Sequence, residues 1–465
     1  MKKKYKVLLK DTVIFAIGSF GSKLILFFLV PLYTNYLTTA EYGTADLVST
    51  FASLIVPISS LAINRAIIRF SMKETIYHQD VIKTTFVALF LSSFVVLSIC
   101  SLLRYYEPIK EWRYYLYFIV IFENFFEAEK NYLKVKDKNK VLSIICILDT
   151  FVLAISNIIM LSMLRLGIKG YLTANILARV FGCVICIFAE DLISDLKNGK
   201  FDRFLAYKML SFSFPLIFSD ISWWVIHSTD KIMIERMVSD SALGLYTVAT
   251  KIPSMMNVLI SIFNQAWAIS SIKEAETTGE TTFYSSVFDL YCFFTFGACI
   301  LFIAIIKPFM NIYVGADFKD AWVYIPFLMV SAVFFAFTVF ISSLYAAMNK
   351  SKHDMWTSIM CAMTNVVVNY FAIRAYGIWG AVIGTVTAYF VCAIMRIIDI
   401  RSIIKLEVQP TFWINMLLIL LHGIVVSIQW KPTIVSILII CTFVVLNKRE
   451  ALLIVTDIKS FLLRR

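Results

Sequence analysis

Apolar blocks of about 20 residues recur along the whole chain and are separated by short polar segments. A helix needs ~20 apolar residues to cross the hydrocarbon layer of a bilayer, so these blocks predict an all-α membrane protein with fourteen transmembrane helices. The predicted helices cover residues 11–37, 44–70, 81–103, 113–130, 141–164, 170–190, 208–233, 243–270, 284–306, 322–348, 354–373, 378–400, 411–429 and 432–447.

The polar segments between these blocks are short, and their basic residues alternate in number from one segment to the next. The segments on the side of the N-terminus hold nearly three times as many Lys and Arg as the opposite segments. The positive-inside rule then predicts that both termini are cytoplasmic. No segment approaches the ~50 residues of a small domain, so we expect no soluble catalytic domain and predict that the protein is not an enzyme.

Composition adds to this interpretation. The chain is 60% apolar and 16% charged, with a mean hydropathy of +0.80, whereas soluble domains are ~45–50% apolar and ~25% charged. The net charge of +12 is explained by basic cytoplasmic loops, so we expect no nucleic-acid partner. All nine cysteines lie in apolar stretches, which argues against a disulfide framework. No metal or cofactor motif stands out, and we expect neither group.

Two local matches indicate an internal repeat. Gly167–Gly170 and Gly377–Gly380 share the pattern Gly-Ile-x-Gly at an offset of 210 residues. Leu37–Gly43 and Val238–Gly244 match at an offset of 201, and each lies between the first two helices of a six-helix block. Because each block has an even number of helices, both enter the membrane from the same side. The repeat is therefore parallel.

The repeat predicts three segments. Residues 1–200 and 201–405 each form a six-helix bundle, and residues 406–465 add two transmembrane helices and a basic tail. Duplicated bundles of this kind are typical of transporters, in which the binding site lies between the halves near the bilayer midplane.

Five basic residues lie within predicted spans; Arg179 is one, and the other four are candidate substrate-binding residues: Lys23, Arg65, Lys231 and Lys251. A charge at bilayer depth costs at least ~2.5–3.5 kcal/mol, so it usually faces a cavity and has a function. Together these residues predict a cationic cleft suited to a phosphate or diphosphate. For Lys231, pairing with Asp230 or another nearby acid is an equally good interpretation.

Three acidic residues within spans, Asp149, Asp220 and Asp230, are candidate sites for a coupling cation. Each could instead form a structural ion pair with a basic residue of a neighbouring helix.

The sequence around the turn between the seventh and eighth predicted helices resembles the signature of a known family. Asp230–Ile234 and Leu243–Ile252 resemble the signature of bacterial O-antigen (Wzx-type) polysaccharide flippases, and Pro31–Gly43 resembles their first turn. These flippases are relatives of the multidrug and toxin extrusion (MATE) transporters and the lipid II flippases. The resemblance implies a MATE-like fold and a protein of the bacterial inner membrane. By position, Lys23 and Lys251 match places where such proteins hold cavity cations.

The resemblance also implies an activity, which is the movement of undecaprenyl-diphosphate-linked oligosaccharide from the cytoplasmic to the periplasmic leaflet by alternating access. Its partners would be the lipid-linked oligosaccharide, membrane lipid, and the glycan polymerase and chain-length machinery. The main alternative is a cation-coupled multidrug antiporter of the same fold, which would favour an acidic or apolar cleft. A membrane enzyme would need a catalytic loop, and the buried charges argue against a scaffold that transports nothing.

Overall fold

The computed structural model describes residues 21–71, 76–276, 281–348, 350–404 and 406–451. Within these ranges the chain is helical and contains no strand, which confirms the predicted all-α class. Residues 21–36 form the described part of the first predicted helix; its N-terminal portion lies outside the described residues.

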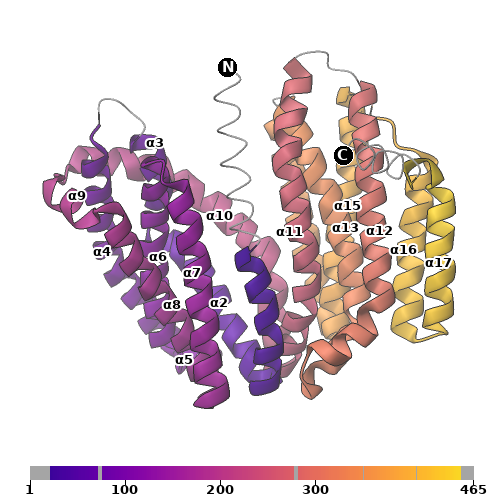
Figure 1. The fold of residues 1–465 in the computed structure, drawn as a ribbon, viewed down its shortest axis with the longest axis horizontal. Coiled ribbons are helices and arrows are strands. Elements are labelled where there is room, and N and C mark those ends of the chain that lie inside the picture. The colour runs from indigo at the N-terminus through magenta and orange to yellow at the C-terminus, as the bar shows by residue number, and fades with distance from the viewer. Residues whose placement is uncertain (1–20, 72–75, 277–280, 349, 405, 452–465) are drawn as a thin grey trace, which may run out of the picture. The chain divides into compact units, whose positions relative to one another are not determined.

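Every other predicted span coincides with helical structure, and Figure 1 shows the order of the helices. The first are α2 (Thr39–Ser59), α3 (Ile63–Ser71), α4 (His78–Leu102), α5 (Glu107–Lys110), α6 (Arg113–Val135), α7 (Asn139–Asn157), α8 (Gly167–Glu190), α9 (Leu192–Asn198) and α10 (Arg203–Met237). They are followed by α11 (Asp240–Glu276), α12 (Thr281–Tyr313), α13 (Ile325–Ala347), α14 (Ser351–Tyr376), α15 (Ile378–Ile404), α16 (Pro410–Ile428) and α17 (Pro432–Leu446).

Not all of these helices are equally apolar. Nine of the described helices are long and apolar enough to cross a membrane, and the count is ten if α2 and α3 form one span. Helix α6 is not among them, because it carries several charged residues. Helix α17, with 15 residues, is shorter than a full span.

Packing divides the chain into two compact units. The first unit comprises the described residues of Met1–Glu235 and Ser239–Gly244, and the second those of Arg236–Val238 and Leu245–Arg465. Helix α10, which the repeat assigns to the second bundle, thus packs with the first unit. Its Trp224 side chain donates a hydrogen bond to a backbone carbonyl of α2. The boundary at residue 200 stays a prediction about the repeat.

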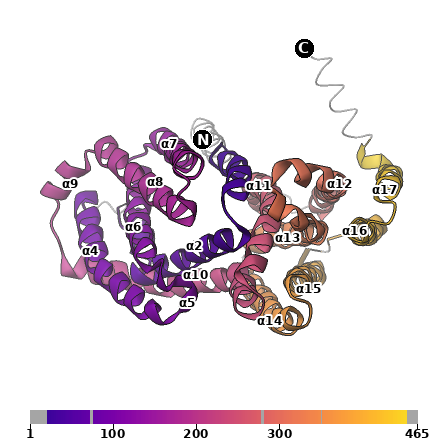
Figure 2. The same ribbon diagram turned by 90° about the horizontal axis from the view of Figure 1, so that it is seen from below.

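Helix α6 is the central helix of the first unit. It packs against α2, α3, α4, α7 and α8, and Figure 2 shows α4 and α8 on its two sides. The equivalent helix of the second unit is α13, because α6 and α13 are each the fourth helix of a six-helix repeat. Helix α13 packs against α12, α14, α15 and α16. The two helices differ in chemistry: α13 contains no charged residue, whereas α6 carries Arg113 at its start and five more charged residues from Glu123 onward.

The second predicted span is broken. Helices α2 and α3 meet at an angle of 51°. Leu61 and Ala62 lie between them in the left-handed region, with φ of 49° and 51°, where a residue with a side chain pays a steric penalty. The Ala62 amide still donates to the Pro57 carbonyl at 3.0 Å, so the backbone remains hydrogen-bonded through the break. The break turns α3 and its arginines away from the line of α2.

The short helix α9 is tied to the end of α6. The Asp195 carboxylate accepts hydrogen bonds from the Tyr132 hydroxyl at 2.9 Å and the Gln79 amide at 3.0 Å, and it forms an ion pair with Lys136. Burial raises the pKa of Asp195, but these hydrogen bonds outweigh it and hold the pKa below its ordinary value. The carboxylate therefore stays charged and fixes α9 against α4 and α6.

The repeat is visible in the local backbone. Gly167 and Gly377, which are 210 residues apart, both have positive φ, at 55° and 58°. Each stands at the start of an equivalent helix, α8 or α15. At the other match, Thr38 and Ser239 both cap a helix N-terminus, because their side-chain oxygens accept hydrogen bonds from backbone amides of the first turn.

These two capped turns pack on each other within the first unit. A Cβ atom placed on Gly43 would lie 2.2 Å from the carbonyl oxygen of Asp240, and one placed on Gly244 would lie 2.0 Å from that of Thr39. The contact is reciprocal, since Thr39 and Asp240 are themselves equivalent in the repeat. Only glycine permits this approach of the two backbones.

We expect Gly43→Ala and Gly244→Ala each to lower the free energy of unfolding by at least about 1–3 kcal/mol, because an added methyl group would overlap a backbone carbonyl. Thermal unfolding of the purified protein in detergent measures this. Gly423→Ala is the matched control, since its added methyl group would meet side chains at an ordinary 3.8 Å. An equal effect at all three positions would contradict the close contact.

Candidate substrate-binding cavity

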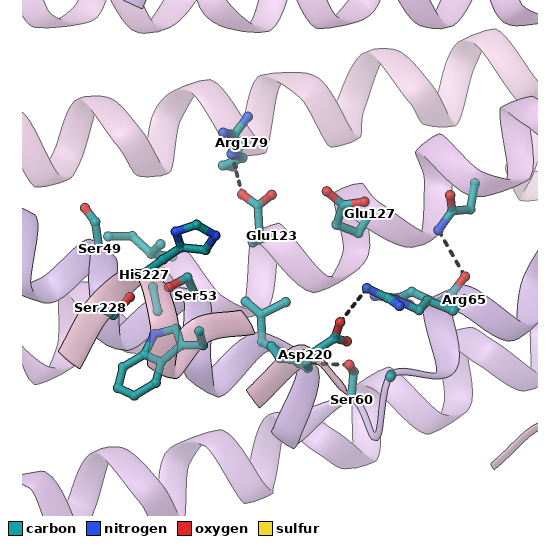
Figure 3. Close-up of a pocket in the computed structure, with 18 of the residues that line it drawn as sticks. Ser49, Ser53, Ser60, Arg65, Glu123, Glu127, Arg179, Asp220, His227 and Ser228 are labelled. Carbon is teal, nitrogen blue, oxygen red and sulfur yellow. Dashed lines mark hydrogen bonds and ion pairs between the residues drawn. The ribbon is translucent and has the colours of Figure 1, made fainter. Parts of the chain in front are cut away.

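A polar cavity of about 700 Å³ lies inside the first unit. Its walls come from α2, the break after α2, α3, α6, α8 and α10, and Figure 3 shows its labelled side chains converging on one space. The lining residues are Ser49, Ala52, Ser53, Val56, Pro57, Ser60, Ala62, Asn64, Arg65, Ile119, Glu123, Glu127, Asn131, Asn175, Arg179, Asp220, Trp224, His227 and Ser228.

Helical periodicity places these residues on the cavity face of each helix. On α6 the lining residues are Ile119, Glu123, Glu127 and Asn131, at a constant spacing of four. Residues four apart lie one above the other on a helix, so α6 presents a polar stripe to the cavity. The α2 face contributes small side chains, mostly serines and alanine, which leave room for a ligand.

Arg179 of α8 is held by two carboxylates. Its Nε lies 2.5 Å from Glu123 Oε2 on α6, and its NH1 lies 2.5 Å from Asp149 Oδ2 on α7. A guanidinium can donate through both of these edges at once. The three side chains therefore tie α6, α7 and α8 together at the wall of the cavity.

Arg65 forms a second ion pair across the cavity. Its NH2 group lies 2.5 Å from Asp220 Oδ1 on α10, and Figure 3 shows the two side chains pointing toward each other. The Arg65 side chain is 53% exposed, whereas that of Asp220 is 17% exposed. Arg65 is on α3, directly after the break, so the bend of the second span brings this guanidinium to the cavity.

The remaining polar groups complete the lining. Glu127 pairs with Lys130 one turn further along α6, at 2.6 Å. Trp224 is positioned by the hydrogen bond from its indole N–H to the Thr50 carbonyl oxygen, at 2.9 Å. His227 and Ser228 follow on the next turn of α10.

Among the described lining residues two arginines face three carboxylates. Each arginine is already paired, so the cavity of the first unit is not cationic. The cationic cleft that the sequence predicts between the two halves stays a prediction.

Comparison with known proteins identifies the family. Residues 8–269 match the model of the polysaccharide biosynthesis protein family. The chain belongs to this family. It is similar to an uncharacterized membrane protein of Haemophilus influenzae, with 27% identity over 273 residues, which is 56% of this chain and 64% of that protein. The chain thus matches less than two thirds of this relative's length.

Two solved structures show the same fold as this polysaccharide biosynthesis family member. The lipid II flippase MurJ in an inward closed conformation is 13% identical, with a TM-score of 0.71, and the match covers 95% of this chain and 100% of that one. A multidrug resistance MATE transporter in an outward-facing conformation is 14% identical, with a TM-score of 0.59, and the match covers 85% and 96%. The predicted MATE-like fold is therefore confirmed.

The four basic residues predicted to bind substrate do not all lie in the cavity of this family member. Arg65 lines the cavity. Lys231 pairs with Asp46 of α2, with Nζ and Oδ2 2.8 Å apart, so a structural ion pair accounts for it. Lys23 is exposed and Lys251 is half-buried. In the part of the chain that the structure describes, neither lysine lines the cavity or has an ion-pair partner.

The three predicted acids are also separated. Asp220 lines the cavity and pairs with Arg65. Asp149 is buried behind the lining and pairs with Arg179. Asp230 is buried near the end of α10, where its Oδ1 accepts a hydrogen bond from the Lys231 amide. Which of them, if any, binds a coupling cation stays a prediction.

Sequence analysis did not single out Glu123 and Glu127. The signal was present, since Glu123, Glu127 and Asn131 recur every four residues inside a segment otherwise rich in aromatic and apolar residues. Such spacing predicts one polar helix face. The apolar length of segment 113–130 predicts a span, but length alone does not show which face of the helix lines a cavity.

We expect Arg179→Ala to lower the free energy of unfolding by about 3–5 kcal/mol, because it leaves two carboxylates unpaired inside the helical bundle. Thermal unfolding in detergent measures the loss. Arg104→Ala is the control: Arg104 is exposed and its guanidinium lies over the ring of Tyr105, 4.6 Å from the centroid. Equal stability of the two variants would show that the Glu123–Arg179–Asp149 cluster does not hold the unit together.

Proposed function

We propose that this protein is a flippase, which moves undecaprenyl-diphosphate-linked oligosaccharide, an O-antigen or similar repeat unit, from the cytoplasmic to the periplasmic leaflet by alternating access. The observation that carries the proposal is the cavity of about 700 Å³ in the first unit, which is lined by serine, asparagine, arginine and carboxylate side chains. A sugar headgroup needs such a compartment, because its hydroxyl groups must be hydrogen-bonded away from water. Membership of the polysaccharide biosynthesis family and the MurJ-like fold support it.

Arg65 is the group in the cavity best suited to the diphosphate. The Arg65 side chain is 53% exposed, and among the described residues its ion pair is with a single oxygen of Asp220, so an incoming phosphate oxygen can take the place of the carboxylate. A guanidinium binds phosphate oxygens through two parallel hydrogen bonds. Arg179 differs, since two carboxylates already hold it.

Lys23 and Lys251 are further candidates for binding the diphosphate, each proposed from its position in the sequence. Both lie on helices whose sequence resembles the flippase turns, and neither is neutralised by a carboxylate among the described residues. In this scheme they hold the diphosphate during transfer, while the prenyl tail remains in the lipid. Lys231 is left out of the scheme, since Asp46 already pairs with it.

The proposed cycle needs an energy source and a membrane context. We place the protein in the bacterial inner membrane with both termini in the cytoplasm, where the basic loops would face. A cation gradient is the proposed driving force, with Asp220 as its first candidate, because protonation of that carboxylate would release Arg65. A glycan polymerase and chain-length machinery would then use the exported units.

The acidic side chains of the cavity favour one alternative, a cation-coupled multidrug antiporter. Glu123, Glu127 and Asp220 outnumber the two arginines, and the fold is shared with a MATE transporter. Overexpression distinguishes the two functions: an antiporter would raise resistance to cationic drugs in a strain lacking its own efflux pumps, whereas a flippase would restore surface glycan and leave resistance unchanged.

We expect Arg65→Ala and Lys23→Ala each to abolish surface glycan in a strain that depends on this protein, while the protein remains in the membrane, because each variant removes a charge that the diphosphate needs. Immunoblotting of surface glycan and of the protein measures both. Arg69→Ala is the matched control. Arg69 lies on the same short helix, packs over the Phe212 ring at 4.2 Å and does not line the cavity. Unchanged export by Arg65→Ala would remove that residue from the mechanism.

A further inference from the structure

The cavity of the first unit is lined by three carboxylates and two arginines, and both arginines already form ion pairs with carboxylates. Arg179 donates to Glu123 and Asp149 through different nitrogens, and the second of these acids lies outside the cavity lining. The positive charge of Arg179 is thus neutralised by carboxylates of the protein itself. An anionic group on a sugar would have to displace a carboxylate held at 2.5 Å before it could bind there.

Glu127 adds negative charge to the lining. Its side chain is 38% exposed, and its partner Lys130 is only 20% exposed. The ammonium group of Lys130 lies over the Phe126 ring, 4.7 Å from the centroid, and Lys130 is not among the lining residues. Of this pair, the Glu127 carboxylate therefore faces the cavity and the Lys130 ammonium group does not.

The carboxylates of Glu123 and Glu127 favour sugars that carry hydrogen-bond donors. An ionised carboxylate only accepts hydrogen bonds, so it pairs with a sugar hydroxyl or amide N–H but not with another carboxylate. Hydrogen bonds from hydroxyl groups to carboxylates are charge-assisted and strong. Two carboxylates that share a low-dielectric site repel each other. A hydroxyl-rich sugar fits this lining, whereas a uronate does not.

The other lining groups are compatible with an uncharged sugar. The hydroxyl groups of Ser49, Ser53 and Ser60 donate to carbonyls of α2 and keep lone pairs that can accept hydrogen bonds, and the amides of Asn131 and Asn175 add neutral polar groups. The Trp224 indole is positioned by its own hydrogen bond to Thr50 and contributes an apolar surface against which a sugar ring can pack.

Only one copy of the repeat carries this stripe. The equivalent central helix α13 of the second unit holds no charged residue. The polar face of α6 is therefore not needed to build a six-helix bundle, since α13 builds its own with buried apolar side chains. The charges of α6 have a role specific to the first unit.

From these observations we propose that the cavity of the first unit selects glycan units without carboxylate groups, such as hexoses and acetamidohexoses, and rejects units in which a uronate would meet Glu123 and Glu127. This inference rests on the proposed flippase function and specifies its substrate class. The selective element is the acidic face of α6, whereas the diphosphate is bound by the basic residues named above.

The test compares two lipid-linked sugars that differ at one carbon. Cells that lack their own flippases and express the full chain are supplied with glycosyltransferases that make either a prenyl-diphosphate-linked hexose or the corresponding hexuronate. Periplasmic exposure is measured by periodate oxidation and a membrane-impermeant hydrazide, as a fraction of the total lipid-linked sugar. We expect the hexose to be exposed at least about tenfold faster than the hexuronate, as like-charge repulsion at short range predicts.

A conservative variant tests the role of α6 directly. Glu127→Gln removes the charge but keeps the size of the side chain, and we expect it to reduce the hexose preference several-fold. Glu107→Gln is the matched control, because Glu107 forms the same type of pair with Lys110, three residues further on, but is 81% exposed and lies outside the cavity. It should leave the preference unchanged.

The outcomes separate the two proposals. Equal exposure of hexose and hexuronate by the wild-type protein would overturn the proposed selectivity and leave the flippase function intact. Exposure of neither sugar would overturn the flippase function, and the selectivity with it. A Glu127→Gln variant that still exports the hexose is folded, so an unchanged tenfold preference in that variant would overturn the role of α6.

Discussion

A charge inside a bundle of apolar helices has to be matched locally, because the surrounding medium does not solvate it. The first unit meets this constraint with Arg179, which joins Glu123 of α6 to Asp149 of α7 from its own position on α8. This contact sets the spacing of three helices and so defines one wall of the cavity. The polar face of α6, the serine face of α2 and the ion pair of Arg65 are then arranged around the space that this wall leaves open.

Comparison of the two repeats shows which polar residues are specific to the first unit. The two repeats share the helix order, the positive-φ glycines Gly167 and Gly377, and the capped turns that contain Gly43 and Gly244. They differ at their central helices, where α6 is polar and α13 is apolar. In the second unit the buried Arg396 pairs with Asp354 at 2.8 Å. The scaffold has therefore been retained in both repeats, and the polar cavity lies in the first unit, which includes α10.

Much of this could be predicted from the sequence. The length of the apolar blocks gives the helices, and the matched turns give the repeat, because both depend on local pattern. Pairing between helices could not be predicted in the same way. Arg65 and Asp220 are 155 residues apart and meet only because α2 breaks at Leu61 and Ala62, which no proline or glycine at those positions announces. Glu123 and Glu127 were missed because the apolar length of segment 113–130 identifies a span without showing which face of the helix lines a cavity.

The central claim is that the sugar headgroup occupies the cavity of the first unit. Photo-crosslinking tests it most directly, with a benzophenone side chain placed at Trp224 in the cavity or at Trp356, which is 62% exposed on α14 of the second unit. The account predicts that a radiolabelled lipid-linked hexose crosslinks from position 224, that excess unlabelled substrate abolishes this crosslink, and that position 356 captures only bulk lipid. Capture of bulk lipid alone from position 224, or equal capture of the hexose from both positions, would contradict it.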